Sequence, residues 1–367
     1  MSKVHQIAVL AGDGIGPEIV TQAVKVLDAL RGADFDFLSK TALVGAAALD
    51  VHGEPLPEAS VTIAKSSDAV LFGAVGDPRF DAFEASKRPE RAILGLRREL
   101  GLFAALKRVT VSANLAHLSP LRSDLIAGTD LLVVRELNGD VYTGQPKGER
   151  TSPDGPFAGQ REGYDTMRYA EGEIRRIAHV AFNASQSRSG RVCSVDKANV
   201  LATSRLWREI VTDVAKEYPN VELSHMYADN AAMQLVTAPT RFDTLLTANL
   251  FGDVLTDVAS VLTGSIGLPA SALLGDSNLG MYEAGHGTAL DIAGQDLANP
   301  LACIRAAALM LRYSLKREDL ATRIETAVDQ VLKAGLRTQD LPGGLSPIGT
   351  DAMGDAVVQA MLNQTQG

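Results

Sequence analysis

The sequence predicts an α/β fold, and three observations support that prediction. Short apolar runs alternate along the chain with stretches whose apolar residues recur every three or four positions, a pattern typical of buried strands alternating with amphipathic helices. The 367 residues are too many for one small core and suit two closely packed domains or one large α/β unit. No flexible interdomain tether is evident in the sequence, so we expect the domains to share a central sheet or to meet at a tight hinge.

The elements can be assigned in chain order. A buried strand is expected at 7–10 and a glycine-rich turn at 12–16. Pro17 and Glu18 then open a helix, because proline suits a first turn and an acidic side chain favours the positive helix end. Further strands are expected at 69–72, 131–134, 191–195, 221–227 and 242–246, and further helices at 174–182, 206–218, 301–315 and 320–334. Residues 151–164 are rich in Gly, Pro, Ser and charge, which predicts a mobile loop or arm.

Composition restricts the partners and the location. The formal net charge of −9 disfavours nucleic acid and anionic membranes as partners, and an anionic substrate would need cations gathered at its site. The N-terminal residues lack the apolar core of a signal peptide, and no apolar run is long enough to span a bilayer. We therefore expect a cytoplasmic protein. Cys193 and Cys303 form no disulfide framework or zinc pattern, and we interpret them as buried thiols.

The glycine cluster at 12–16 does not fit the dinucleotide fingerprint of a Rossmann fold. That fingerprint places its third glycine one residue later and needs an acidic residue about 20 positions on, at the end of a second strand. Here Pro17 follows the cluster at once, and Asp34 and Asp36 lie in no clear strand. Taken alone, the cluster is equally compatible with a structural turn.

An acidic group gives a stronger indication of function. Asp253 and Asp257 are four residues apart in a segment that reads as a helix start, which places both carboxylates on one helical face. Because like charges repel, this arrangement indicates a cation between them, and Asp229 can supply a third oxygen. Carboxylate oxygens suit Mg²⁺ or Mn²⁺ and not zinc. The alternative is a solvated acidic face with Asp253 as a helix cap.

Cationic and proton-transferring side chains accompany the acidic group. Arg135 ends a buried strand, and a charged residue there typically points into the ligand crevice of an α/β sheet. Arg97 and Lys107 could also bind carboxylates, although as isolated residues they suit a solvated surface equally well. Lys197 follows the strand at 191–195, where a lysine beside a metal ion could exchange protons near neutrality, and Tyr142 could be a general acid.

Taken together, these segments resemble the β-decarboxylating dehydrogenase family, which includes isopropylmalate, isocitrate, homoisocitrate and tartrate or D-malate dehydrogenases. The resemblance covers nearly the whole chain in order. It is carried by residues 12–18 (GDGIGPE), 134–137 (VREL), 194–200 (SVDKANV), 249–253 (NLFGD), 291–294 (DIAG) and 298–300 (ANP). Any one motif would be weak, but their co-occurrence overrides the structural alternatives given above. The isopropylmalate branch looks most similar.

The resemblance implies a two-domain isopropylmalate-dehydrogenase-like fold with a shared central sheet that is not a Rossmann fold. The cofactor-side domain would be discontinuous and would comprise residues 1–102 and 264–367. Residues 103–263 would carry substrate, metal and dimer contacts, with an arm near 141–164. The protein would be a homodimer with shared active sites.

The implied reaction is the oxidative decarboxylation of 3-isopropylmalate to 4-methyl-2-oxopentanoate in leucine biosynthesis, with NAD as oxidant and Mg²⁺ (or Mn²⁺) as metal. Asp229, Asp253 and Asp257 match the metal ligands. Lys197, helped by Asp229, matches the group that takes the hydroxyl proton, and Tyr142 matches the acid that protonates the enol. Relative to Arg97, Lys197 and Asp229 would come from the neighbouring subunit.

The same resemblance assigns the binding residues. Substrate carboxylates would be bound by Arg97, Lys107 and Arg135, and the isopropyl group by Ile93, Leu94 and, from the neighbouring subunit, Val200. The cofactor would be bound by Glu90, Asn199, His286, Gly287, Asp291 and Asn299. The carboxylate of Asp291 would accept hydrogen bonds from the adenosine ribose and repel the 2′-phosphate of NADP. Isocitrate would leave a third carboxylate unpaired against the apolar wall.

Four positions depart from the family pattern. Lys107 stands where arginine is expected, which keeps the charge but loses the bidentate fork. Arg108 replaces a usual proline, and it could substitute for Lys107. Ala105 replaces a common asparagine, and Leu290 replaces a common proline. These departures leave open a paralogue acting on another 3-substituted malate, D-malate, tartrate or homoisocitrate, or a non-catalytic regulatory relative.

Overall fold

The chain forms two compact units in a computed structural model that describes residues 4–84, 87–111, 113–341 and 346–364. Unit 1 comprises Met1–Leu102, Leu106–Gly128 and Ser260–Gly367, and unit 2 comprises Phe103–Ala105 and Thr129–Ala259. Residues 106–128 and 260–263, which we expected in the second domain, group with unit 1. The physical reason is local packing, because the backbone of Gly264 lies against the carbonyl of Leu118.

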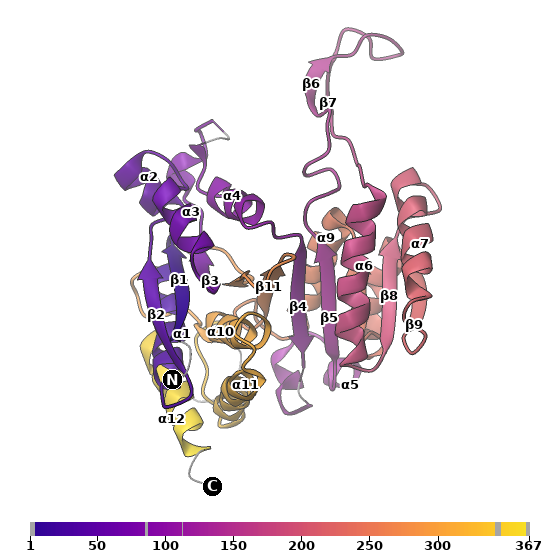
Figure 1. Ribbon diagram of the computed structural model, residues 1–367. Helices are drawn as coiled ribbons and strands as arrows, with labels where there is room; N and C mark the ends of the chain where they lie inside the picture. The colour runs from indigo at the N-terminus through magenta and orange to yellow at the C-terminus, as the bar shows by residue number, and fades with distance from the viewer. Residues whose placement is uncertain (1–3, 85–86, 112, 342–345, 365–367) are drawn as a thin grey trace. The chain divides into compact units, whose positions relative to one another are not determined.

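Unit 1 contains strands on one sheet with helices packed against it (Figure 1). Its strands are β1 (Val4–Gly12), β2 (Asp36–Thr41), β3 (Ala69–Ala74), β4 (Ala104–Thr110, whose first two residues group with unit 2), β11 (Ala270–Leu274) and β12 (Gly280–Ala284). Its helices are α1 (Gly16–Asp28), α2 (Ala46–His52), α3 (Glu58–Lys65), α4 (Arg91–Glu99), α5 (Ser123–Ile126), α10 (Leu301–Tyr313), α11 (Glu318–Lys333) and α12 (Thr350–Asn363). The strand order is β2-β1-β3-β12-β11-β4.

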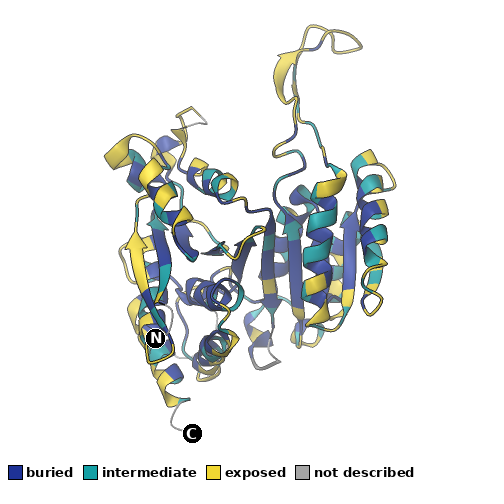
Figure 2. Cartoon of the chain, viewed as in Figure 1, coloured by how far each residue is buried: buried dark blue, intermediate teal, exposed yellow. Residues whose placement is uncertain are grey.

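The core of unit 1 is built around α10. Almost every residue of this helix is buried, as its dark colour in Figure 2 shows, and it packs against α1 and α11 and against β11 and β12. A helix that is buried on nearly every side, apart from Arg305, Arg312 and Tyr313, is expected in a protein interior. Strand β1 is buried over Ile7–Leu10, and Pro17 lies in the first turn of α1, as the sequence predicts.

Unit 2 contains a parallel sheet and a projecting ribbon. Its strands are β5 (Asp130–Glu136), β6 (Gly148–Thr151), β7 (Arg161–Tyr164), β8 (Arg191–Asp196), β9 (Glu222–Tyr227) and β10 (Thr244–Thr247). Its helices are α6 (Glu171–Gln186), α7 (Ala202–Ala215), α8 (Ala228–Thr237) and α9 (Asn249–Val261). The order β5-β10-β8-β9 is parallel throughout, so the carboxyl ends of these strands lie at one edge.

The α/β prediction is confirmed, with differences in detail. Asp36 begins β2, a strand that the sequence analysis missed because its exposed residues give no apolar alternation. Because Asp36 lies at the start of that strand and not at its end, the rejection of a Rossmann fingerprint stands. The antiparallel pairing of β11 with β12 also departs from an all-parallel dinucleotide-binding sheet.

The segment at 151–164 is a structured arm and not only a loop. Strands β6 and β7 pair in antiparallel register, with Gly148 opposite Tyr164 and Thr151 opposite Arg161. The pairing is supported by ion pairs between Arg150 and Glu162 and between Arg161 and Glu149. Figure 1 shows this ribbon extending away from the body of unit 2.

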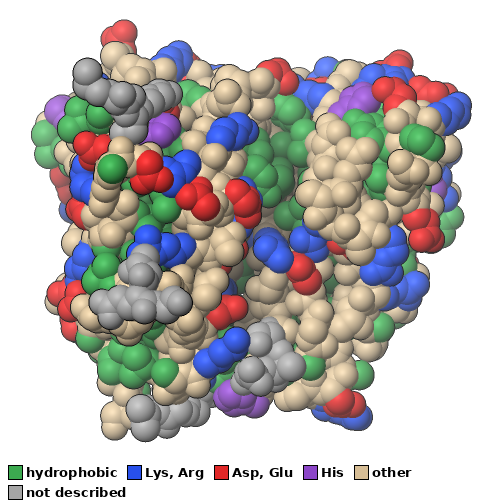
Figure 3. All heavy atoms as spheres, turned by 60° about the horizontal axis from the view of Figure 1, so that its bottom comes forward, with side chains coloured by type: hydrophobic (Ala, Val, Ile, Leu, Met, Phe, Trp, Pro, Cys, Tyr) green, Lys and Arg blue, Asp and Glu red, His purple; other side chains and the backbone are tan. Residues whose placement is uncertain are grey.

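The surface carries both signs of charge. On the face shown in Figure 3, Lys and Arg side chains are interspersed with Asp and Glu, although the net charge is −9. The electrostatic field that a ligand meets therefore depends on the charges near its binding site and not on the net charge of the protein. Within the described ranges, no helix is long and apolar enough to cross a membrane.

Candidate active site

Arg135 is held in unit 2 by the helix that follows the neighbouring strand. It lies near the carboxyl end of β5, as the sequence predicts, and its Nε and Nη2 donate to Oδ1 of Asn249 at 3.0 and 2.7 Å. Its Nη1 donates to Asp253. Asn249 is fixed in turn, because its Nδ2 donates to the carbonyl of Leu137 at 2.9 Å. The guanidinium is therefore oriented before any ligand binds.

Tyr142 joins the same group through its hydroxyl. Its Oη donates to Oδ2 of Asp253 at 2.8 Å, and the guanidinium carbon of Arg135 lies 5.9 Å from its ring centroid. Partial burial, followed by the hydrogen bond to Asp253, raises the pKa of Tyr142 above its ordinary value. The phenol therefore keeps its proton at neutral pH, which a general acid requires.

Asp253 and Asp257 lie in the interior of α9, because the helix begins at Asn249. The prediction of a helix start at 252–257 and the alternative of Asp253 as a cap are both wrong, since Asn249 and not Asp253 opens the helix. The four-residue spacing does place both carboxylates in one helix. Among the described residues, no three His, Cys, Asp or Glu side chains come close enough together to hold a metal ion.

Asp229 is paired with Lys197. Lys197 follows β8, Asp229 is the second residue of α8, and the Lys197 Nζ donates to the Asp229 Oδ1 at 2.7 Å. This hydrogen bond lowers the pKa of Asp229, which therefore stays ionised as a metal ligand must be. The side chain of Asp229 is 65% exposed, so its second oxygen is accessible from outside the chain. Asn199 and Val200 follow Lys197 and are exposed.

Two buried carboxylates support these reactive groups. Asp196, at the end of β8, accepts two hydrogen bonds from Arg208 at 2.9 Å and one from the backbone of Ala198 at 2.9 Å, which fixes the turn that presents Lys197. Glu136 accepts from the backbone of Gly139 at 2.7 Å and so shapes the loop that leads to Tyr142. Burial raises the pKa of Glu136.

Lys107 and Arg108 are consecutive in β4 of unit 1 and therefore point to opposite faces. Lys107 is only 9% exposed, and a Cβ at Gly285 would lie 2.7 Å from its Nζ, so the ammonium lies against the turn that carries His286. Arg108 faces a cavity on the other side, together with Thr110. The possibility that Arg108 substitutes for Lys107 is therefore excluded.

Helix α4 presents the other predicted substrate residues of unit 1. Ile93, Leu94 and Arg97 recur at three- and four-residue spacing and so share a helical side. Leu94 is 49% exposed, which leaves an apolar side chain available for contact. Arg97 forms an ion pair of 3.7 Å with Glu283 of β12. Glu90 directly precedes the helix and is exposed.

The glycine turn at 12–16 is packed against the predicted cofactor loop. Gly14 has a φ of 58°, and a Cβ there would lie 2.1 Å from the carbonyl oxygen of Thr288, so only glycine fits. The backbone N–H of Ile15 donates to the same carbonyl at 2.9 Å. The side chain of Asp13 accepts from the backbone of Ala46, at 2.8 Å. The turn is thus structural, and it positions the segment between His286 and Asp291.

The predicted cofactor residues of unit 1 differ in how free their side chains are. Burial lowers the pKa of His286, so its ring is neutral at neutral pH and Nδ1 donates to the Gly287 carbonyl at 3.0 Å. Its Nε2 is then a buried acceptor that has no hydrogen-bond partner among the described residues. The side-chain amide of Asn299 makes two hydrogen bonds. Its Nδ2 donates to Asp340 at 3.0 Å, and its Oδ1 accepts from the backbone N–H of Leu301 at 3.0 Å. Gly287 and Asp291 are exposed.

Three contributors were missed as individual residues by the sequence analysis. Asn249 was quoted within a motif but given no role, although an amide between a strand and a helix is a recognisable capping signal. Glu283 pairs with Arg97 across elements far apart in sequence, and no local pattern signals it. Thr288 acts through its backbone carbonyl, which the residue type does not reveal.

Comparison with known proteins supplies the remaining observation. The family model for isocitrate/isopropylmalate dehydrogenases matches residues 6–357. Proteins named 3-isopropylmalate dehydrogenase from Burkholderia multivorans and Cupriavidus pinatubonensis are each 58% identical over 97% of this chain and 100% of theirs. A solved isocitrate dehydrogenase from Methylococcus capsulatus has a TM-score of 0.83 and 33% identity, and covers 98% of this chain and 99% of its own. The similarity therefore spans both units.

Proposed function

Because the chain belongs to the isocitrate/isopropylmalate dehydrogenase family, we propose that it oxidises and decarboxylates 3-isopropylmalate to 4-methyl-2-oxopentanoate in leucine biosynthesis, with NAD as the oxidant. The observation that carries this proposal is the full-length similarity to relatives that bear the name of that activity. The decarboxylating dehydrogenase class follows from the family. The substrate, the cofactor and the cytoplasmic location are our proposals.

The residues present fit both a metal and a dinucleotide. Carboxylate oxygens are the ligands that Mg²⁺ and Mn²⁺ prefer, and Asp253, Asp257 and Asp229 supply them. We propose that the protein is a homodimer in which Asp253 and Asp257 of one subunit and Asp229 of the neighbouring subunit hold the metal ion. For the dinucleotide, the unpartnered Nε2 of His286 is an acceptor suited to an amino or hydroxyl donor. When bound, the two groups would supply an electrophile for the substrate oxygens and an acceptor for the C2 hydride.

Protein side chains bind the substrate and carry out the two proton transfers. Arg97, Lys107 and Arg135 bind the substrate carboxylates, for which Arg135 is already oriented by Asn249. Lys197 takes the hydroxyl proton as the hydride leaves C2. Loss of CO₂ from the carboxylate of the resulting β-keto acid leaves an enolate, to which Tyr142 gives a proton at carbon. The raised pKa of Tyr142 suits that donation.

Specificity would follow from two features. The exposed side chains of Leu94 and, from the neighbouring subunit, Val200 would form an apolar wall with Ile93 for the isopropyl group, against which a further carboxylate would be unpaired. The carboxylate of Asp291 would accept from the ribose of NAD and repel the 2′-phosphate of NADP. One methylene in such a pocket is worth only about 1–3 kcal/mol, so other alkyl groups could be accepted.

The test is to follow NADH formation by absorbance with purified protein, Mg²⁺ and NAD⁺. A kcat/KM for 3-isopropylmalate well above those for isocitrate, D-malate and tartrate is expected. Because Lys107 replaces an arginine, the second candidate is a relative that acts on another 3-substituted malate, and preference for such a substrate would replace our proposal. Absence of turnover with every malate tested would favour a non-catalytic relative.

A further inference from the structure

The backbone of Lys197 is fixed, but its side chain is long and flexible. The carbonyl of Lys197 accepts hydrogen bonds from the backbone N–H groups of Val200 at 3.1 Å and Leu201 at 3.0 Å. The carboxylate of Asp196 accepts from the next backbone N–H, that of Ala198, at 2.9 Å. A flexible aliphatic stem still separates Nζ from this turn. The position of Nζ therefore depends on the contacts that the side chain makes beyond the turn.

Nζ of Lys197 lies against two side chains at the junction of β9 and α8. It donates to Oδ1 of Asp229 at 2.7 Å and lies over the ring of Tyr227, 5.6 Å from the centroid. A cation at this distance is attracted by the negative face of an aromatic ring. Asp229 is also our proposed metal ligand, whereas Tyr227 has no role in the proposed function. The ring is therefore a contact for Nζ that a metal ion would not occupy.

The ring of Tyr227 projects from a defined face of the sheet in unit 2. Tyr227 ends β9 and lies opposite Asp196, which ends β8, in the parallel register. Because side chains alternate along a strand, the side chain of His225, two residues earlier in β9, lies on the same face as the ring. Nε2 of His225 is 3.1 Å from Oγ1 of Thr212 in α7. Helix α7 therefore covers the face from which Tyr227 projects.

Arg208 of α7 holds the ring on this face. Its Nε and Nη2 each donate to the carboxylate of Asp196 at 2.9 Å, and its Cζ lies 5.2 Å from the centroid of the Tyr227 ring. The side chain of Asp196 is only 1% exposed, so this bidentate ion pair is well oriented. Arg208 and Lys197 thus contact the same ring, one from the helix and the other from the turn after β8.

We propose that Tyr227 is a positioning residue: its ring, held by Arg208, keeps Nζ of Lys197 where the base must lie to take the hydroxyl proton. This inference rests on the proposed function, in which Lys197 is that base. The face of the ring supplies the attraction, so phenylalanine should replace tyrosine, whereas an aliphatic side chain should not. A displaced base slows proton transfer without weakening the binding of the substrate carboxylates, which other residues bind. Loss of the ring should therefore lower kcat and leave KM for the malate nearly unchanged.

Tyr227→Ile removes the ring with little disturbance of the backbone. A β-branched side chain suits the end of a strand, the tyrosine is 38% exposed, and its side chain makes no cap hydrogen bond to α8. Tyr227→Phe is the matched control, because it keeps the ring and removes only the hydroxyl. Substitution of Arg208 would instead leave the buried carboxylate of Asp196 without its ion pair, which would destabilise the fold.

The first measurement is trace acetylation of the full chain with acetic anhydride, followed by mass spectrometry of the peptides that contain Lys197 and Lys216. A side chain held against a ring meets the reagent less often, so we expect Lys197 to be acetylated about threefold faster in Tyr227→Ile than in the wild type. Tyr227→Phe should match the wild type. Lys216, an exposed lysine of unit 2 that also has a carboxylate partner, should be acetylated equally in all three proteins. Equal rates at Lys197 in the wild type and Tyr227→Ile overturn the proposal.

Steady-state kinetics of NADH formation supply the second measurement. We expect kcat of Tyr227→Ile to be about tenfold below that of the wild type, with KM for the malate nearly unchanged and with kcat retained in Tyr227→Phe. Equal loss in both variants, or an effect on KM alone, overturns the positioning role. If Tyr227→Ile unfolds at a lower temperature than the wild type, Tyr227→Met, which also lacks a ring, replaces it with the same expected and contradicting results. If the wild type turns over no malate, the proposed function fails, and the acetylation rates alone decide whether the ring holds Lys197.

Discussion

Units 1 and 2 hold their candidate residues by different means. In unit 2, reactive side chains pair directly with one another, as Tyr142 does with Asp253 and Lys197 with Asp229. In unit 1, Lys107 beside Gly285 and His286 beside Gly287 are held by burial or by backbone groups, while Arg97 is ion-paired with Glu283. Coupled acid–base pairs suit proton transfer, whereas buried and backbone-held groups suit binding. Substitutions of the proton-transferring residues of unit 2 should therefore lower kcat, and those of the binding residues of unit 1 should raise KM.

Lys197→Ala tests the largest expected effect. Removing a general base typically costs about 10²–10⁴-fold in rate, so kcat should fall by that factor while NAD binding, measured by fluorescence, stays near normal. Lys216→Ala is the control, because Lys216 is also an exposed lysine of unit 2 with a carboxylate partner. A wild-type kcat in Lys197→Ala, or an effect confined to KM, would break the comparison between the units.

Asp253→Asn tests the acidic group in two ways. Loss of a carboxylate ligand should sharply raise the Mg²⁺ concentration required for half-maximal activity, measured by titration with the metal. Asp253 also contributes to the raised pKa of Tyr142. Its removal lowers that pKa toward the ordinary value, so the tyrosine loses its proton at a lower pH and the alkaline loss of activity should begin earlier than in the wild type.

The two results of Asp253→Asn are separable. An unchanged metal requirement would limit Asp253 to orienting Arg135 and Tyr142. An unchanged alkaline limb would mean that Tyr142 is not the group titrating there. Asp276→Asn, on an exposed loop of unit 1, is the control for the removal of one acidic charge.

Local patterns were sufficient for most of the fold, whereas for the site they supplied only candidate residues. Strand β1 and helix α10 were predictable because burial produces apolar runs, short in the strand and long in the helix. Strand β2 was not predictable, because most of its residues are exposed and its sequence shows no alternation of apolar and polar residues. Lys107 and Arg108 could not be assigned to their faces from sequence, because a shift of one residue in β4 exchanges them.

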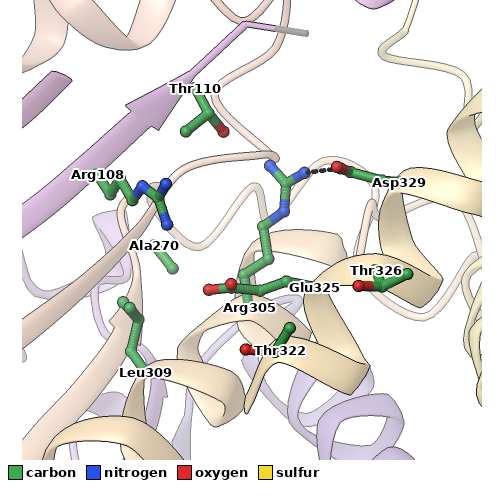
Figure 4. A pocket seen from close by; sticks show the side chains of 9 residues that line it. All are labelled: Arg108, Thr110, Ala270, Arg305, Leu309, Thr322, Glu325, Thr326 and Asp329. Atoms are coloured by element: carbon green, nitrogen blue, oxygen red, sulfur yellow. Dashed lines mark hydrogen bonds and ion pairs between the residues drawn. The ribbon is translucent and has the colours of Figure 1, made fainter. Parts of the chain in front are cut away.

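Contacts between distant elements were the part that sequence could not supply. The ion pair between Arg97 and Glu283 joins a helix to a strand nearly two hundred positions away. The pairing of Lys197 with Asp229 joins the loop after β8 to the first turn of α8, which follows β9, and it depends on the parallel pairing of β8 with β9. The cavity beside Arg108 (Figure 4) is lined by four elements, β4, β11, α10 and α11, which only the folded unit brings together. The residue types indicated the chemistry of the candidate site. Which side chains pair with one another followed only from the assembled sheet.

Asp291→Ala tests the cofactor side of unit 1 with an intermediate effect. Loss of a charge-assisted hydrogen bond to the ribose should raise KM for NAD about tenfold, with kcat nearly unchanged. Because the repelling charge is also lost, KM for NADP should fall, and initial rates with each cofactor measure both. Asp296→Ala is the control, provided that folding of this variant is verified. The check is needed because the carboxylate of Asp296 accepts a hydrogen bond from the backbone N–H of Asp351. Equal loss with NAD and NADP would remove Asp291 from cofactor selection.

Lys107→Arg gives the smallest expected effect and the sharpest test of unit 1 as a binding surface. The change keeps the charge and adds a bidentate fork for a carboxylate, so KM for the malate should fall about threefold while kcat stays constant. Initial rates at several substrate concentrations measure both constants, and Lys107→Met, which keeps length but removes charge, should raise KM by more than Lys107→Arg lowers it. If Lys107→Arg instead raises KM, the confined space beside Gly285 selects lysine for shape. A change in kcat would mean that Lys107 acts on the reacting atoms, and the division between a binding unit and a proton-transfer unit would fail at this residue.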